Sequence, residues 1–427
     1  MTVSLTNWAG NVRFGADSVR RPASVPELQR LVASCARVRA IGTGHSFSPI
    51  ADTTGDLVSV AGLPRVTELD SGRLRVRVSA GLTYAELAGY LHGHGLALAN
   101  LASLPHISVA GACATGTHGS GDAVGSLATA VSALDLVTAD GDVVTMTRSA
   151  DGDEFAGAVV ALGSLGIVVS LTLDVQPAFE IRQYVYENLP REQVDGQLAE
   201  VFAAGYSVIL FTRWRGPWIR QAWLKLLAGP ARDAARDSAQ PAVWYGGRLA
   251  AGQRHPVPGV PADSTTEQLG VAGPWHERLP HFRPEHVPSV GSELQSEYLL
   301  PRRSAADAML AVDQIAAAVA PLVQISEIRT VAADGLWLSP CYGRDTVGIH
   351  FTWVADARAV AEVLPLVEAE LAPWGARPHW GKLFSTSPEV ISGLYPRLPD
   401  FRRLMSRFDP VGKFRNDFVD ASISAGR

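Results

Sequence analysis

The sequence predicts an α+β protein of two domains, and three observations support this. With 427 residues, the chain is long for a single hydrophobic core. Helical and strand patterns are interleaved over residues 1–178. Beyond that point aromatic residues become frequent, and the proline-rich passage 255–261 indicates an ordered connecting segment without regular secondary structure. We therefore predict a first domain at 1–178, a second at 179–385, and a segment at 386–427 that returns to the first.

Capping and turn signals define the elements within these domains. Ser24 with Glu27, and Thr83 with Glu86, have the spacing of a capping box, so a helix is expected to begin at each pair. The first domain is predicted to contain, in order, a helix after Ser24, a strand at 38–41, a hairpin at 66–79, a helix from Thr83 to about Leu91, a hairpin at 132–147, a helix at 153–162 and a strand at 167–175. The second is predicted to contain strands at 292–302, 326–330 and 346–354, and helices at 304–319 and 358–371.

Composition narrows the class of function. The net charge is −5, and lysine and arginine are scattered, so neither nucleic acid nor an anionic membrane surface is an expected partner. The most apolar long stretch, 308–325, contains Asp313 and Pro321 and indicates a packed helix rather than a membrane span. The N-terminus has no signal-peptide pattern, and the three cysteines are far apart, which is typical of free thiols in a reducing compartment. We expect a cytoplasmic protein.

The stretch RAIGTGHSFSPI (39–50) places His45 at the tip of a glycine turn that follows a strand. It is not a dinucleotide fingerprint, because the third position of the G-x-G-x-x-G spacing is Phe47. It also lacks the G-K-[ST] end of a Walker loop and the G-x-S-x-G pattern of a nucleophile elbow. Backbone N–H groups in such a turn would suit a pyrophosphate, and a plain structural turn is the alternative.

A second segment, ASLPHISVAGACATGTHGSGDAVGS (102–126), contains five glycines separated by small residues. Such positions allow the backbone to lie close to a flat or phosphorylated group. An irregular structural loop is the alternative, but a long irregular segment within a compact domain is usually functional. Two such segments in one α+β domain predict a large nucleotide cofactor.

A metal site is not expected. The sequence has no H-E-x-x-H motif, and His92 and His94 have no carboxylate or third histidine nearby. His276, His281 and His286 lie among prolines and charged residues, so we expect them at the surface or at a domain edge.

Polar residues of four kinds cluster in the second domain. Alternation in SEIRT places Glu327 and Arg329 on one face of a strand, and GIHFTW does the same for His350 and Thr352. RPHWGK adds Lys382. A solvated or salt-bridged surface would explain each alone. A carboxylate, a guanidinium, an imidazole and an ammonium in one cleft would together bind and polarise a hydroxylated substrate.

Ten stretches, in order along almost the whole chain, resemble the FAD-dependent alditol and xylitol oxidases, relatives of the aldonolactone oxidases in the vanillyl-alcohol-oxidase-like flavoprotein superfamily. They are NWAGN (7–11), GTGHSF (42–47), NLASLPHISVAGACATGTHGSG (100–121), ALGSLGIVVSLTLD (161–174), GPWHERLPHFR (273–283), EIRTVAAD (327–334), SPCYGRDTV (339–347), HFTW (350–353), RPHWGK (377–382) and FDPVGKF (408–414). The resemblance implies the two-domain fold of that superfamily. The first domain would bind FAD (the PCMH type), and the second would bind substrate on a mixed or antiparallel sheet.

In that family the histidine of GTGHS is bonded through its ring to the flavin 8α-methyl, so the resemblance assigns covalent attachment of FAD to His45. A neutral imidazole is a competent nucleophile, and a tether prevents loss of the cofactor. The residues that the resemblance places around FAD are Ile41, Gly42, Thr43, Gly44, His45, Ser46, Phe47, Ser103, Ser108, Gly111, Ala114, Thr115, Gly116, Thr117, His118, Gly119, Ile167 and His379.

The same resemblance implies a polyol substrate above the flavin ring, with O2 as electron acceptor and H2O2 as product. The implied contacts are Ser103 and Glu327 for one hydroxyl, Arg329 and Lys382 for the reacting terminal hydroxyl, and His350 and Thr352 beside it. Two cations at that oxygen would favour the developing alkoxide. Lys382 or His350 would accept its proton, with Lys382 weakly preferred.

The predicted function is oxidation of the terminal primary hydroxyl of alditols, such as xylitol and sorbitol, by a monomeric enzyme. The nearest alternative is an aldonolactone oxidase or dehydrogenase of the same fold, acting on a gulono- or galactonolactone. It shares a motif like HWGK, but not obviously the EIRT and HFTW set in this form. A polyol- or flavin-binding protein without turnover is the alternative from another class. The intact set Ser103, Glu327, Arg329 and Lys382 argues against it.

Overall fold

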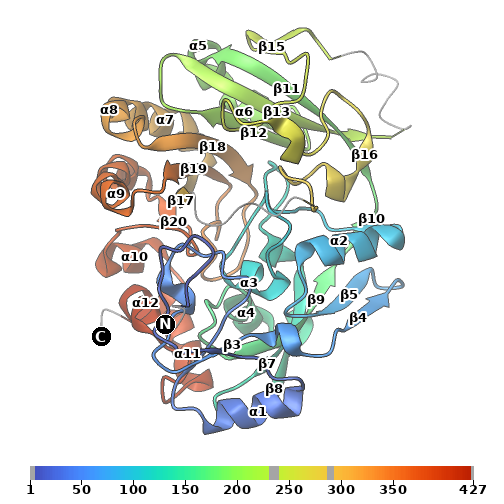
Figure 1. Ribbon diagram of the computed structural model, residues 1–427, viewed down its shortest axis with the longest axis vertical. Coiled ribbons are helices and arrows are strands. Elements are labelled where there is room, and N and C mark those ends of the chain that lie inside the picture. The colour runs from blue at the N-terminus through green and yellow to red at the C-terminus, as the bar shows by residue number, and fades with distance from the viewer. Residues whose placement is uncertain (1–4, 230–239, 286–292, 425–427) are drawn as a thin grey trace.

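The computed structural model describes residues 5–229, 240–285 and 293–424, and has two halves, each with its own sheet (Figure 1). The lower half in Figure 1 holds a five-stranded sheet, and the upper half holds a ten-stranded one. The predicted two-domain α+β class is confirmed. His286 and the first residue of the strand predicted at 292–302 lie outside the described residues.

The lower half is built on antiparallel strands in the order β4-β5-β9-β7-β8. Their bounds are β4 (Thr67–Asp70), β5 (Arg75–Ser79), β9 (Ile167–Asp174), β7 (Val131–Val137) and β8 (Val143–Thr147). Beside them are the parallel strands β1 (Val19–Arg20), β3 (Asp56–Val58) and β2 (Val38–Ala40), and the pair β6 (Leu96–Ala97) and β10 (Gln176–Pro177). The helices are α1 (Val25–Ser34), α2 (Tyr84–Gly93), α3 (Val109–Ala114) and α4 (Arg148–Val159). Both predicted hairpins are confirmed, as β4–β5 and β7–β8.

The upper half is built on a sheet with the order β14-β15-β11-β13-β12-β18-β19-β17-β20, and β16 also pairs with β11. The strands are β11 (Glu180–Pro190), β12 (Ser207–Thr212), β13 (Trp218–Ala228), β14 (Val243–Trp244), β15 (Gly247–Leu249), β16 (Gly273–Pro274), β17 (Glu293–Pro301), β18 (Val323–Val331), β19 (Thr346–Val354) and β20 (Arg377–Pro378). Its helices are α5 (Arg191–Val194), α6 (Leu198–Ala203), α7 (Ala305–Gln314), α8 (Ala316–Val319) and α9 (Ala357–Leu371). Among the described residues, no helix is both long and apolar enough to cross a membrane.

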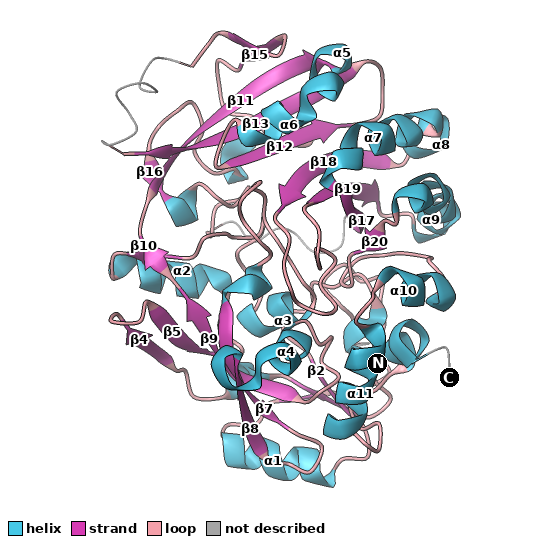
Figure 2. Ribbon diagram, turned by 180° about the vertical axis from the view of Figure 1, so that it is seen from behind, coloured by secondary structure: helices cyan, strands magenta, loops and turns pink. Residues whose placement is uncertain are grey.

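The C-terminal helices α10 (Pro388–Leu394) and α11 (Leu398–Phe408) lie beside the lower half in both views (Figure 1, Figure 2), as α12 (Asp417–Val419) does in Figure 1. Phe401 and Phe414 of this segment belong to the lower hydrophobic core. The buried Lys413 donates hydrogen bonds of 2.7 Å to the carbonyls of Val32 and Ala139. These contacts support the predicted return of 386–427 to the first domain, whose boundaries stay a prediction.

Local capping signals confirm the starts of two predicted helices. The Ser24 side chain accepts a hydrogen bond from the backbone N–H of Glu27 at the start of α1. Thr83 and Glu86 form a reciprocal capping box at the start of α2. Each cap satisfies backbone groups that the first helical turn leaves without partners, so the local sequence is enough to predict it.

Two local predictions were wrong in detail. The helix expected at 153–162 begins as predicted, after a break in α4 at Gly152 (φ of 50°), but it ends at Val159, and Leu162, with φ of 54°, cannot continue it. The helix expected at 304–319 breaks at Ile315, whose N–H donates to the carbonyl of Val312 and tightens the turn. The irregular loop that was the alternative for 102–126 does not hold throughout, since the segment contains α3, whose small residues lack the pattern of large apolar side chains that reveals a helix.

Candidate active site

A cavity of about 570 Å³ lies between the lower half and the upper sheet and is lined by both. The predicted cofactor and substrate residues that line it are Ile41, Gly42, Thr43, Gly44, His45, Ser46, Phe47, Ser103, Ser108, Gly111, Ala114, Thr115, Thr117, His118, Glu327, Arg329, His350, Thr352, His379 and Lys382. Gly116, Gly119 and Ile167 are not in the lining, although neighbours of each are. The fold therefore brings most of the candidates from both domains to one space.

One wall of the cavity, here called the backbone wall, consists of the 42–44 turn and the start of α3. A Cβ atom added at Gly42 would lie 2.3 Å from Ser108 Oγ, so only glycine allows the two segments to approach this closely. Gly44 has φ of 71°, a left-handed conformation that favours glycine. The wall therefore presents peptide groups and small side chains, which fits a flat, phosphorylated cofactor such as FAD.

His45 lies half-buried at the end of this wall. Its ring stacks on Trp8, with centroids 5.2 Å apart and an interplanar angle of 17°. Burial, with a smaller contribution from the charges of Lys382 and His106, lowers the pKa of His45 to about 4. The imidazole is therefore neutral near pH 7, the state in which it can act as a nucleophile.

The opposite wall, here called the sheet wall, is one face of the ten-stranded sheet. In the strand register, Glu327 lies opposite His350, and His350 lies opposite Glu297. Because side chains alternate between the two faces, these residues share a face, while the residues between them pack beneath the sheet. The residues of the sheet wall that line the cavity are Glu293, Gln295, Glu297, Ile325, Glu327, Arg329, His350 and Thr352. Those packed beneath include Ile328, Ile349 and Phe351.

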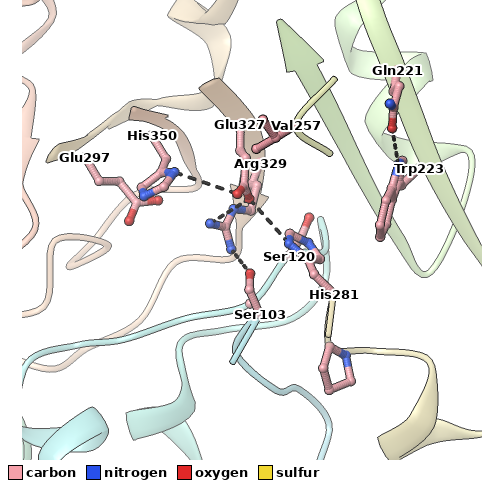
Figure 3. Close-up of polar contacts among 12 residues, drawn as sticks. Ser103, Ser120, Gln221, Trp223, Val257, His281, Glu297, Glu327, Arg329 and His350 are labelled. Atoms are coloured by element: carbon pink, nitrogen blue, oxygen red, sulfur yellow. Dashed lines mark hydrogen bonds and ion pairs between the residues drawn. The ribbon is translucent and has the colours of Figure 1, made fainter. Parts of the chain in front are cut away.

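Arg329 links the sheet wall to the lower half of the molecule (Figure 3). Its Nη2 lies 2.9 Å from Glu327 Oε2, and its Nη1 donates to Ser103 Oγ at 3.1 Å. Burial raises the pKa of Glu327, although the charge of Arg329 opposes this. Among the described residues, Glu327 Oε2 and Arg329 Nε have no hydrogen-bond partner of good geometry. Buried polar atoms in this state favour a polar ligand or ordered water at the site.

Lys382 and His350 share one acceptor, Gln295 Oε1. Lys382 Nζ donates to it, and His350 Nε2 lies 3.2 Å from it. Since an ammonium group can only donate, this amide atom is the acceptor, and His350 Nε2 must carry a proton to bond with it. Burial lowers the pKa of His350 well below its ordinary value. The neutral ring therefore has an unprotonated Nδ1, which lies 3.8 Å from Glu327 Oε1.

His118 and Glu297 form a buried pair on the cavity wall, with His118 Nε2 3.2 Å from Glu297 Oε1. Burial is the largest single effect and favours the neutral acid, but the charge and hydrogen bond of His118, together with the charges of neighbouring groups such as Arg329, hold the pKa of Glu297 well below its ordinary value. His118 Nδ1 lies 2.9 Å from the carbonyl of Gly119 and must donate to it. Glu297 is therefore a charged acceptor beside His350.

In the described ranges, no group of three or more His, Cys, Asp or Glu side chains is placed to hold a metal ion.

Sequence reasoning missed Gln295, Glu297 and His281. The first two belong to a predicted strand, and the pairing of that strand with GIHFTW would have revealed them. His281 was expected at the surface or at a domain edge, and the surface position was wrong, since it is 2% exposed and its Nδ1 lies 3.8 Å from Glu327 Oε2. Its neighbours in sequence are prolines and charges, and only long-range packing on Phe211 and Trp223 buries it.

Comparisons with known proteins agree with this architecture. Residues 16–147 match the FAD binding domain family, and residues 290–422 match the D-arabinono-1,4-lactone oxidase family. The chain is 51% identical to an alditol oxidase from a Streptomyces species, over 98% of this chain and 99% of that protein. It is 28% identical to an L-gulono-1,4-lactone dehydrogenase of Mycobacterium tuberculosis, over 97% of each. The crystal structure of cholesterol oxidase from B. sterolicum has the same fold, with a TM-score of 0.77 and 14% identity over 98% of this chain and 96% of that one.

Proposed function

The chain belongs to the alditol oxidase family of FAD-dependent oxidoreductases, and we propose that it oxidises the terminal primary hydroxyl of alditols such as xylitol and sorbitol to the aldose. Two electrons and two protons leave the alcohol, and O2 takes them up to form H2O2. One observation carries the proposal. Glu327, Arg329 and His350 all line the cavity, and each has a buried polar atom that lacks a hydrogen-bond partner within the described part of the chain. A polyol supplies the alternating donors and acceptors that such a set requires.

We assign FAD to the backbone wall, covalently attached through His45. When bound, FAD takes the hydride from the substrate carbon and passes the electrons to O2. The position of His45 in the cavity lining and its neutral imidazole support the attachment. We expect His45→Ala to release its flavin into the supernatant when the protein is precipitated with acid, whereas the parent keeps a yellow pellet. Acid-stable flavin in the variant would contradict the assignment.

Two cations on the sheet side bind the reacting oxygen in this proposal. Arg329 is held by Glu327 and Ser103, and Lys382 is held by Gln295, so both are oriented before substrate arrives. Positive charge fixed in a buried site stabilises the negative charge that develops on the oxygen as its proton leaves. Glu327 and Ser103 hold the neighbouring hydroxyl, and Thr352 lines the cavity beside them.

The tautomer of His350 bears on which group accepts the substrate proton. His350 lines the cavity, and its unprotonated Nδ1 lies 3.8 Å from Oε1 of Glu327, the residue that holds the neighbouring hydroxyl in this proposal. Lys382, weakly preferred from the sequence, already donates to Gln295, and as an ammonium it cannot accept a proton. We therefore assign proton acceptance to His350 Nδ1 and charge stabilisation to Lys382.

The decisive experiment is bleaching of the flavin spectrum by xylitol under anaerobic conditions, followed by identification of the product and of H2O2 after air is admitted. L-Gulono-1,4-lactone is the comparison substrate, because a relative of the chain is named for it. Faster reduction by xylitol supports the proposal. Faster reduction by the lactone would assign the chain to the alternative, and no reduction by either would contradict catalysis.

We also propose that the protein is a monomer in the cytoplasm. Cys35, Cys113 and Cys341 are free thiols, which is typical of a reducing compartment. Light scattering on the purified protein tests the first statement. Fractionation of the source cells tests the second.

A further inference from the structure

A short turn, residues 279–282, connects parts of the site that are far apart in sequence. The backbone N–H groups of His281 and Phe282 lie 3.2 and 3.4 Å from the carbonyl oxygen of Ser103, to which they donate. On its other side, the turn is bound to Thr266, whose N–H donates to the carbonyl of His281 at 2.9 Å and whose hydroxyl donates to that of Pro280 at 2.8 Å. The turn therefore fixes the backbone of Ser103 from the side of the upper half.

Lys225 anchors this turn to the ten-stranded sheet. It belongs to β13, is 0% exposed, and its Nζ donates to the carbonyl of Leu279 at 2.6 Å. Burial lowers the pKa of Lys225 to about 7, with the charge of Arg329 adding to the effect and that of Glu327 opposing it. A lysine buried this deeply costs free energy that an apolar side chain of similar length would not. Its amine nevertheless lies where it holds the turn.

The ring of His281 places the same turn against Glu327. It packs on Phe211, with centroids 5.7 Å apart, and on the edge of Trp223 at 5.3 Å. Its Nδ1 lies 3.8 Å from Glu327 Oε2, and His350 Nδ1 lies 3.8 Å from Oε1 (Figure 3). An imidazole therefore flanks each oxygen of the carboxylate. His281 Nδ1 has no hydrogen-bond partner among the described residues, so it can bond to Glu327 after a small shift.

We propose that Lys225 and His281 are positioning residues that set the spacing between Glu327 and Ser103, and so select alcohols with a hydroxyl next to the one oxidised. The inference rests on the proposed function, in which Glu327 and Ser103 hold that neighbouring hydroxyl. Neither Lys225 nor His281 lines the cavity, so both act through other groups. A carboxylate that is free to move loses its bond to the substrate hydroxyl, while Lys382, which Gln295 holds, still binds the reacting oxygen and Arg329 keeps its hydrogen bond to Ser103. The effect therefore falls on KM more than on kcat.

Substitution of His281 by Phe and by Gln separates positioning from simple packing. Phe keeps a ring against Phe211 and Trp223 but has no polar atom for Glu327, whereas Gln keeps a polar atom and loses the ring. A packing role predicts that the Phe variant behaves like the parent. His276→Phe is the matched control, because His276 belongs to the same loop but contacts His92, with ring centroids 4.6 Å apart, and does not line the cavity.

The test is a double-mutant cycle with Glu327→Gln, read as KM and kcat for xylitol. We expect His281→Phe to raise KM about tenfold, the size of one lost hydrogen bond to a charged group, with a smaller change in kcat. His281→Gln should restore part of the loss. In the Glu327→Gln background the same change should add less than about twofold, because the two residues act as one unit. A parental KM in the Phe variant, or an equal loss in both backgrounds, would overturn the proposal.

Lys225→Met provides a second route if His281→Phe does not retain flavin. It leaves the ring in place and removes the hydrogen bond to Leu279 together with the buried amine. A rise in KM that is not additive with Glu327→Gln supports the inference, and a parental KM contradicts it. Turnover of xylitol by the parent is measured first. If it is absent, the proposed function fails and the inference fails with it, whereas parental kinetics in active variants overturn the inference alone.

Discussion

The backbone wall and the sheet wall recognise their ligands by different means. The backbone wall owes its shape to a missing side chain, since a Cβ at Gly42 would lie 2.3 Å from Ser108 Oγ. The sheet wall owes its chemistry to side chains that strand register brings together, such as Glu297, His350 and Glu327. The first is therefore encoded by short contiguous motifs, and the second by the pairing of strands far apart in sequence. Changes in the first should affect cofactor retention, and changes in the second should affect chemistry.

The largest expected effect is loss of a cation from the sheet wall. Lys382→Ala and Arg329→Ala should each lower kcat/KM for xylitol by more than about 10²-fold, because each removes charge stabilisation of the reacting oxygen. The flavin-to-protein absorbance ratio should stay parental, since neither side chain belongs to the backbone wall. Arg358→Ala, which removes a cation whose side chain is 92% exposed, is the control and should be parental in both measurements. Activity within a few-fold of the parent would remove the charge role from these two residues.

The matching change in the backbone wall is Gly42→Ala. The added methyl group must displace Ser108, and overpacking of this kind typically costs about 1–3 kcal/mol. We expect a lower flavin-to-protein ratio with near-parental turnover per bound flavin, and recovery of flavin in the double variant with Ser108→Gly. Gly93→Ala is the control, because nothing lies within 4 Å of a Cβ there. Full flavin content in Gly42→Ala would show that the close approach of the two segments is dispensable.

The pH dependence of kcat/KM should also distinguish the two walls, since the titratable groups expected to act in turnover belong to the sheet side. His350 must be unprotonated to accept the proton, and burial holds its pKa well below the ordinary value. Hence kcat/KM should not fall between about pH 8 and pH 6, because a base loses activity only below its own pKa. Lys382 must stay protonated, and burial lowers its pKa, so the alkaline fall should begin earlier than for an ordinary lysine. An acid fall centred near the ordinary pKa of histidine would contradict the assignment of His350.

The same contrast explains what could be predicted from the sequence. His45 and Lys382 belong to contiguous motifs, so their part in a site could be anticipated from the neighbouring residues alone. Glu297 could not be singled out without the register of β17 against β19, although its strand was predicted. Lys225 and His281 are buried by contacts between distant segments, and their own neighbours in sequence give no sign of it. Sequence patterns thus predict which element a residue belongs to, whereas its partners across the sheet depend on tertiary pairing.

The smallest expected effect is on the pH dependence of the free energy of unfolding, and it comes from Lys225 in the upper half. The pKa of Lys225 is lowered from 10.5 to about 7 in the folded protein, while the unfolded chain keeps the ordinary value. Between these two values the unfolded state binds more protons, so this residue makes the free energy of unfolding rise with pH. Below about pH 7 both states are protonated, the slope vanishes, and the full cost of the buried charge applies.

Lys225→Met removes this contribution, so its melting temperature should rise less than that of the parent between about pH 7 and pH 9. The carbonyl of Leu279 loses its donor at every pH, which shifts the whole curve but not its slope. Gly42→Ala is the matched comparison, because its steric cost in the backbone wall is independent of protonation. Thermal unfolding at constant ionic strength measures all three proteins. Parallel curves of melting temperature against pH for the parent and Lys225→Met would mean that Lys225 keeps an ordinary pKa in the folded protein. The difference in pH dependence between the sheet side and the backbone wall would then depend on His350 and Lys382 alone.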